Sequence, residues 1–218
     1  MYTPRPFVVE DFDEIQSFVE KHPSITLVSV AKDGTPLATL LPAVWERSQL
    51  SGENFGEIIT HMSKGNQQWR EITDSQVGLA IVQGPQAYVS PSNYGNKESD
   101  HKVVPTWNYQ TVHFSGPLRV TEDPVEINKI VSELTDFHEI HRKDPWATSQ
   151  ADATYMKNQL NSIVGIVMKV QKVEAKYKLS QNRPREDQER VSWDLAQSAK
   201  SDERVISSEM ARLMKTID

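Results

Sequence analysis

Four segments of the chain gather side chains that could bind a planar, phosphorylated ligand. The first, His61 to Trp69, combines a lysine, amide donors and the backbone N–H groups of a turn that contains glycine. Phosphate groups are bound by side chains and backbone groups of these kinds. Taken alone, this segment fits a polar loop anchored by Trp69 equally well.

The second and third segments are rich in proline and aromatic residues. Residues 84–94 (GPQAYVSPSNY) contain two tyrosines and the hydroxyls of Ser90 and Ser92, and residues 104–109 (VPTWNY) place Trp107 beside Asn108. A tryptophan beside an asparagine presents a flat apolar face and a hydrogen-bonding edge together, which suits a planar heteroaromatic ring. A rigid loop that closes one end of a barrel explains both segments as well.

The fourth segment, residues 178–183 (KLSQNR), begins with a cation and contains three uncharged hydrogen-bonding side chains, those of Ser180, Gln181 and Asn182. A solvated turn is the simpler interpretation of this segment by itself. All four segments together suggest a binding site.

Familiar catalytic patterns are absent from the sequence. The glycines form no Gly-x-Gly fingerprint, no Gly-x-Ser-x-Gly motif occurs, and there is no cysteine. His138 and His141 are three residues apart, and two polar residues near a helix end explain them better than a metal site, so we expect no metal. His61 and His113 are acid–base candidates by type only, and structural histidines are the favoured interpretation. Catalytic residues therefore stay unassigned.

Composition restricts the class of protein. The 218 residues fit one domain, or one domain with a helical appendage, and the lack of cysteine fits the reducing cytoplasm. No apolar run approaches the roughly 20 residues of a membrane span. The net charge of −6 argues weakly against a large nucleic-acid-binding face.

Hydrophobic periodicity and turn residues predict the elements that position these segments. We expect strands at 24–31, 36–45, 56–62, 76–83, 111–121 and 163–173, with a bend at Gly116-Pro117. We expect helices at 9–21, 67–72, 123–142 and 152–161, a helical tail at 186–218, and mostly loop at 84–108. The Asp33-Gly34 dipeptide predicts a hairpin between the first two strands.

This pattern predicts a mainly β fold with peripheral helices, in which an antiparallel barrel is closed or nearly closed. We assign residues 1–183 to the barrel domain with inserted helices. Residues 184–218 form a C-terminal helical extension that packs on the barrel or on a partner subunit. The early strands alternate imperfectly, which is consistent with a dimer interface.

Taken in order, these motifs resemble the PaiB-type family, the bacterial "FMN-binding negative transcriptional regulators" of the FMN-binding split-barrel superfamily. The resemblance covers about Met1 to Arg190, and its specific elements are PTWNY at 105–109 and KLSQN at 178–182. The other motifs are the Pro-rich start (Met1-Tyr2, Pro4, Phe7), Asp33-Gly34-Thr35-Pro36 with Leu41-Pro42, His61/Asn66/Trp69, Gly84-Pro85 with Tyr88-Val89-Ser90-Pro91, and Val112-His113.

The resemblance implies a homodimeric split β-barrel with a flavin-sized site at the subunit interface. It also implies a regulatory role in the expression of sporulation and degradative-enzyme genes. The sequence departs from the family pattern at Leu40, Asn93 and 64–67, which leaves haem open as an alternative ligand.

We therefore expect an FMN-binding protein with a regulatory or redox-sensing role. The expected cofactor-binding residues are Thr39, His61, Lys64, Asn66, Tyr88, Ser90, Tyr94, Thr106, Trp107, Asn108, Lys178, Ser180 and Gln181. Lys64 and Lys178 would bind the phosphate. Trp107 and Tyr94 would flank the ring, and Asn108 or Asn66 would form hydrogen bonds with its polar edge.

Two other functions remain open. One is an FMN-dependent oxidoreductase that acts on a small substrate. The other is a repressor that touches DNA phosphates through Arg183, Arg185 and Arg190, although acidic residues lie among them. We expect DNA association to be weak or indirect, and no membrane partner.

Overall fold

The computed structural model describes residues 1–47, 55–95 and 103–216, and it divides into two compact units. Unit 1 contains Met1–Ile15, Gln83–Val112 and Glu174–Asp218. Unit 2 contains Gln16–Val82 and His113–Val173. Strands β5 (Val77–Val89), β6 (Thr106–Thr121) and β8 (Lys172–Lys178) and helix α1 (Phe12–Lys21) contribute residues to both units.

Unit 2 is built on a ring of six strands. Besides its parts of β5 and β6, the ring contains β2 (Ser24–Val30), β3 (Pro36–Glu46), β4 (Glu57–Ser63) and β7 (Ile163–Lys169). The strands are hydrogen-bonded in the order β6-β5-β2-β3-β4-β7, and a further antiparallel pairing between β6 and β7 closes the ring. A closed ring leaves no free strand edge, so unit 2 is a small β-barrel.

The hairpin between β2 and β3 follows from the Asp33-Gly34 sequence. Gly34 adopts a φ of +90°, a conformation that residues with a Cβ rarely take. The Asp33 carboxylate accepts a hydrogen bond from the Thr35 backbone N–H at 2.9 Å. The predicted hairpin is confirmed, with Val30 opposite Pro36.

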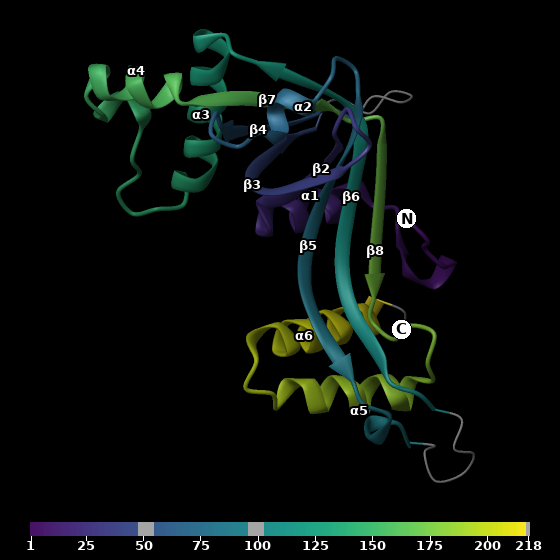
Figure 1. Cartoon of the computed structure of the whole chain (residues 1–218). Helices are drawn as coiled ribbons and strands as arrows, with labels where there is room; N and C mark the ends of the chain where they lie inside the picture. The colour runs from purple at the N-terminus through teal and green to yellow at the C-terminus, as the bar shows by residue number, and fades with distance from the viewer. Residues whose placement is uncertain (48–54, 96–102, 217–218) are drawn as a thin grey trace. The chain divides into compact units, whose positions relative to one another are not determined.

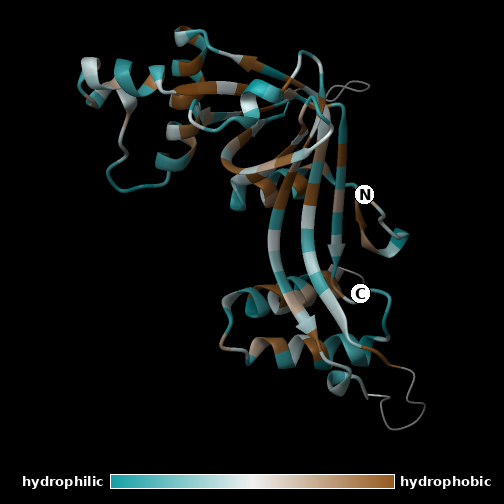
Figure 2. Ribbon diagram, in the orientation of Figure 1, coloured by the Kyte–Doolittle hydropathy of each residue, from teal (hydrophilic) through white to brown (hydrophobic). Residues whose placement is uncertain are grey.

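Helices of unit 2 contact the strands of the barrel. They are α2 (Gln68–Glu71), α3 (Pro124–Glu139) and α4 (Ala153–Asn161), with the short 3-10 turn η4 (Thr148–Gln150) before α4. The Asp123 side chain caps α3, and Ile130 and Leu134 of that helix join a buried cluster with Ile59 and Val167. Figure 2 shows how strongly the hydrophobic residues concentrate on β7.

Unit 1 is a sheet portion covered by the C-terminal helices. Its strand order is β1-β8-β6-β5, where β1 is Val8–Val9 and β8 is Lys172–Lys178. Helices α5 (Arg185–Ala196) and α6 (Ser201–Thr216) lie side by side (Figure 1) and bury a hydroxyl pair, Ser192 and Ser207, 3.1 Å apart. Two 3-10 turns complete the unit, η1 (Arg5–Phe7) and η2 (Pro91–Asn93).

Two predictions of secondary structure were wrong. Residues 84–108 are not mostly loop where the structure describes them, because β5 continues to Val89 and β6 begins at Thr106. Ala87 and Val89 are buried, whereas the alternate residues Gln86 and Tyr88 are exposed, as expected for a strand with one covered face.

The second error concerns residues 163–173, which form not one strand but the whole of β7 and the first two residues of the next strand, which begins at Lys172. The break falls at Val170 and Gln171, whose N–H groups bond to the carbonyls of Gly56 and Ser115 respectively. The other predicted strands and helices are present, with shifted ends. Among the described residues, no helix is both long and apolar enough to cross a membrane.

Candidate functional site

A groove of about 570 Å³ opens in unit 2 between the β2–β3 hairpin and the start of α2. Its walls include Thr39, Asn66 and Gln68, and two of these, Thr39 and Asn66, belong to the predicted site. The turn that delivers Asn66 is fixed by Ser63, whose hydroxyl accepts from the Gly65 N–H at 3.1 Å and whose carbonyl accepts from the Asn66 N–H at 3.0 Å.

A chain of hydrogen bonds runs along one wall of this groove. The Thr39 hydroxyl lies 2.5 Å from Gln68 Oε1, and Asn66 Nδ2 donates to Thr39 Oγ1 at 2.9 Å. Gln68 is only 3 % exposed, and its Nε2 donates to the Leu27 carbonyl and to Ser29 Oγ. The hydrogen bonds of Gln68 to Leu27 and Ser29 of β2 therefore keep the polar groups of this wall in fixed positions.

His61 and Lys64 come from the same strand and turn as Asn66. His61 Nδ1 is buried and has no hydrogen-bond partner among the residues that the structure describes, and burial lowers the pKa of this imidazole below its ordinary 6.5. Lys64 Nζ lies 3.3 Å from a Glu122 carboxylate oxygen, with both side chains substantially exposed. Because exposed pairs of this kind contribute at most about 1 kcal/mol, an incoming anion can compete for Lys64.

A second cluster of predicted residues lies in unit 1 around Lys178. Lys178 Nζ is 2.6 Å from both Thr106 Oγ1 and the Trp107 carbonyl. Burial, followed by the nearby cations Lys176 and Arg183, lowers the pKa of Lys178. No carboxylate forms an ion pair with Lys178 in the described parts of the chain, so this ammonium is available to an anion.

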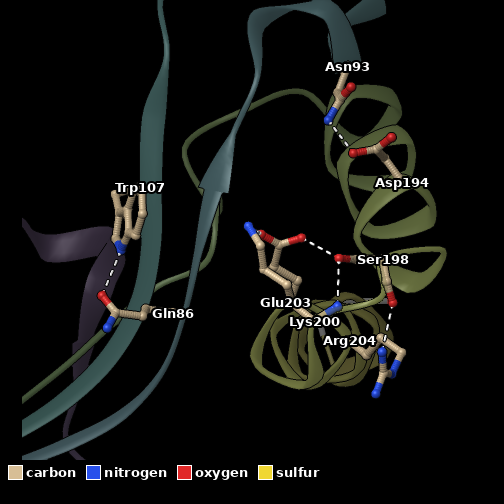
Figure 3. Close-up of polar contacts among 8 residues, drawn as sticks. All are labelled: Gln86, Asn93, Trp107, Asp194, Ser198, Lys200, Glu203 and Arg204. Carbon is tan, nitrogen blue, oxygen red and sulfur yellow. Dashed lines mark hydrogen bonds and ion pairs between the residues drawn. The ribbon is translucent and has the colours of Figure 1, made fainter.

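Aromatic side chains lie beside this cation. Trp107 is 46 % exposed and meets the Tyr88 ring edge-on, with centroids 6.1 Å apart. The Trp107 indole N–H donates to Gln86 Oε1 at 2.9 Å, as Figure 3 shows. The hydrogen bond fixes the indole while part of the ring system stays exposed, an arrangement suited to stacking against a flat ligand.

The remaining predicted residues are engaged within unit 1. Asn108 is fully buried and exchanges two hydrogen bonds with Ser180, at 3.0 and 3.2 Å. Gln181 bonds the Leu179 N–H and the Tyr177 carbonyl, both close in sequence.

Two further predicted residues lie near α5. The Ser90 hydroxyl caps η2, where it accepts from the Ser92 N–H. Tyr94 is 1 % exposed with the Arg183 guanidinium 4.7 Å from its ring centroid, and its buried phenol oxygen has no hydrogen-bond partner within residues 1–47, 55–95 and 103–216.

The structure thus brings the predicted residues into two groups. Thr39, His61, Lys64 and Asn66 belong to unit 2, and the others belong to unit 1. Sequence reasoning missed Gln68 in unit 2 and Gln86 in unit 1, although each bonds directly to a predicted residue. Glutamine has no sequence signature that separates a buried hydrogen-bonding role from a solvated one.

Solved structures share the fold of this chain. The FAD and heme binding protein from Mycobacterium smegmatis superposes with a TM-score of 0.55 at 14 % identity, covering 78 % of this chain and 72 % of that one. The flavocytochrome Anf3 from Azotobacter vinelandii gives a TM-score of 0.53 at 10 % identity, covering 81 % and 72 %. These likenesses confirm the predicted split-barrel fold.

Sequence comparison identifies the family. The "Protease synthase and sporulation protein PAI 2" of Bacillus subtilis is 33 % identical over 215 residues, which is 99 % of this chain and 97 % of that protein. The profile of the family described as "Putative FMN-binding domain" matches residues 1–172. The predicted resemblance is confirmed, and the chain belongs to this FMN-binding family of split-barrel proteins.

Proposed function

We propose that the protein binds FMN with the groove of unit 2 and acts as a regulatory or redox-sensing flavoprotein. The observation that carries the proposal is the position of this groove. The described residues that line it lie between Ala31 and Glu71 in the chain, inside the segment 1–172 that matches the FMN-binding family.

The groove fits the uncharged parts of FMN. Thr39 and Asn66 offer a hydroxyl and an amide, and their hydrogen bonds with each other and with Gln68 hold these groups at fixed positions in the wall. Bound FMN supplies redox chemistry, while the residues of this chain bind and orient it.

The FMN phosphate carries close to two negative charges and needs cations. We propose Lys64 of unit 2 as such a partner, because its ion pair with Glu122 is exposed. A charge-assisted hydrogen bond contributes about 1.5–3 kcal/mol, so loss of this lysine should weaken FMN binding at least about tenfold.

A homodimer forms part of the proposal. Leu40 and Val77 in unit 2 are 71 % and 64 % exposed although both lie in strands. Large exposed apolar side chains in a sheet are suited to burial against another subunit. Light scattering coupled to size-exclusion chromatography tests this, because a monomer at micromolar concentration would contradict it.

The regulatory part of the proposal follows the name of the Bacillus subtilis relative, which refers to protease synthesis and sporulation. Any association with DNA is proposed to be weak or indirect. In α5, Arg185 pairs with Glu189 and Arg190 pairs with Glu186, so acidic neighbours offset these cations. The absence of cysteine from the sequence supports a cytoplasmic location.

A visible spectrum of the purified full chain, followed by titration with FMN, tests the proposal. We expect flavin absorbance or micromolar binding, and a Lys64→Gln variant should bind more weakly. Lys157→Gln, on the exposed face of α4, is the matched control and should bind as the wild type does.

The same experiment decides between the proposal and its alternatives. Absence of flavin bands together with no FMN binding would reject it. Haem bands would favour the haem alternative, and consumption of NAD(P)H by the FMN-loaded protein would favour the oxidoreductase.

A further inference from the structure

Two backbone groups fix the orientation of the amides along the groove wall. The Leu27 carbonyl can only accept a hydrogen bond, so the atom of Gln68 that faces it at 3.1 Å must be the donor Nε2. The Gln68 backbone N–H can only donate, so the atom of Asn66 that faces it at 3.0 Å must be the acceptor Oδ1. Neither amide can be turned over without losing a backbone bond.

These orientations determine where the Thr39 proton lies. Thr39 Oγ1 lies between Gln68 Oε1, which can only accept, and Asn66 Nδ2, which can only donate. The Thr39 hydroxyl therefore donates its single proton to Gln68. Toward the groove, Thr39 has only a remaining lone pair to offer, and Asn66 Nδ2 has one further N–H.

The charges of the residues that line the groove also argue against a phosphate group at this wall. Among the described residues that line the groove, Lys32 is the only cation, and Asp33 and Glu71 are the two anions. The pKa of Asp33 is lowered by a hydrogen bond from the Thr35 backbone N–H, so its carboxylate stays ionised near neutral pH. Lys32 Nζ already donates to the Arg70 carbonyl at 3.3 Å. A net negative lining does not favour a dianionic phosphate.

We infer that the Thr39–Asn66 end of the groove binds an uncharged part of the flavin that both donates and accepts hydrogen bonds, and not the phosphate. Gln68 acts as a positioning residue, because it holds the Thr39 proton away from the ligand. Two parts of FMN have this chemistry, the hydroxyls of the ribityl chain and the N–H and carbonyl edge of the ring. The inference rests on the proposed function and assigns which part of the ligand meets this wall.

Comparison of FMN with riboflavin tests the inference, because the two ligands differ only in the phosphate. Thr39→Val removes the hydroxyl and keeps the shape of the side chain. We expect it to weaken both ligands by the same factor, about fivefold for one neutral hydrogen bond. Thr39→Ser keeps a hydroxyl and should stay close to the wild type.

Gln68→Met tests the positioning role in the same titration. Because Gln68 acts through Thr39, the double variant with Thr39→Val should bind no more weakly than Thr39→Val alone. Gln159→Met, an exposed residue of α4, is the control. If Gln68→Met fails to fold in a urea melt, Thr39→Val still decides the inference. Lumiflavin keeps the ring of FMN but carries a methyl group in place of the ribityl chain, so it separates the two parts of the ligand. If Thr39→Val weakens lumiflavin binding, the ring edge meets this wall, and if lumiflavin binding is unchanged, the ribityl chain does.

Weaker FMN binding by Thr39→Val with unchanged riboflavin binding would place the phosphate at Thr39 and overturn the inference. Unchanged binding of both ligands would also overturn it, while FMN binding by the wild type would leave the proposed function standing. If the wild type binds neither ligand, the proposed function fails and the inference fails with it.

Discussion

The replacement of Gly116 by alanine tests the closure of the barrel that carries the groove. A Cβ at this position would lie 1.9 Å from the Lys169 carbonyl oxygen and 2.9 Å from its carbonyl carbon. Carbon and oxygen atoms that are not bonded rarely approach closer than about 3 Å, so backbone must move by roughly 1 Å or more. No flexible side chain can absorb this displacement.

The cost follows from the bonds that hold the backbone after Lys169. The Val170 N–H donates to the Gly56 carbonyl at 2.9 Å, and the Gln171 N–H donates to the Ser115 carbonyl at 3.0 Å. Loss of one or two such bonds costs about 0.5–1.5 kcal/mol each, and overpacking costs about 1–3 kcal/mol. We expect Gly116→Ala to lower the free energy of unfolding by about 2–4 kcal/mol.

Urea denaturation followed by tryptophan fluorescence measures this change, provided that the m-value stays constant. Gly65→Ala is the matched control, because its Cβ would lie 3.4 Å from the Ser63 Oγ, in ordinary contact. Its effect should stay within about 0.5 kcal/mol. Equal stability of Gly116→Ala and the wild type would refute the close approach of β6 to the end of β7.

Three further predictions concern charged and buried polar groups. Hydrogen bonds from Arg119 and Thr121 lower the pKa of Glu126 from 4.5 to about 2, so its contribution to stability is present above pH 4.5 and is lost as the pH falls toward 2. Because both side chains of the Arg119–Glu126 pair are partly exposed, we expect this contribution to be no more than about 1 kcal/mol. The difference in unfolding free energy between the wild type and Glu126→Gln measures it as a function of pH. A difference that stays constant with pH would contradict this prediction. Burial lowers the pKa of His61, so the unfolded chain binds a proton at this imidazole more readily than the folded chain does. The folded state therefore loses stability as the pH falls below 6.5. An NMR titration of the His61 imidazole with a midpoint at or above 6.5 would contradict this. Asn108→Ala leaves the Ser180 hydroxyl without its buried partner and should cost about 2–4 kcal/mol in a urea melt, whereas a loss below about 0.5 kcal/mol would show that the pair is not needed.

The sequence predicted the barrel well where turn residues and hydrophobic alternation agree. The hairpin at Asp33-Gly34 shows this, because glycine is required at a φ of +90° and the flanking strands alternate. The extension of β5 to Val89 was missed because Gly84-Pro85 looks like a turn, although the alternation of Gln86 and Tyr88 with buried neighbours was readable.

Other features had no local signal. The break at Val170 depends on bonds to the distant carbonyls of Gly56 and Ser115, which no spacing in residues 163–173 reveals. Gln68 is similar, because its role depends on Leu27 and Ser29, about 40 positions earlier in the chain. The sequence prediction therefore named Thr39 and Asn66 but not Gln68, the buried amide that is hydrogen-bonded to both.

The most direct test of the account is a crystal structure of the full chain grown with FMN. We predict flavin density along the groove of unit 2, with an uncharged polar group of the ligand within hydrogen-bonding distance of Thr39 and Asn66. A bound flavin that leaves this groove empty, or one whose phosphate sits against Thr39, would contradict the account.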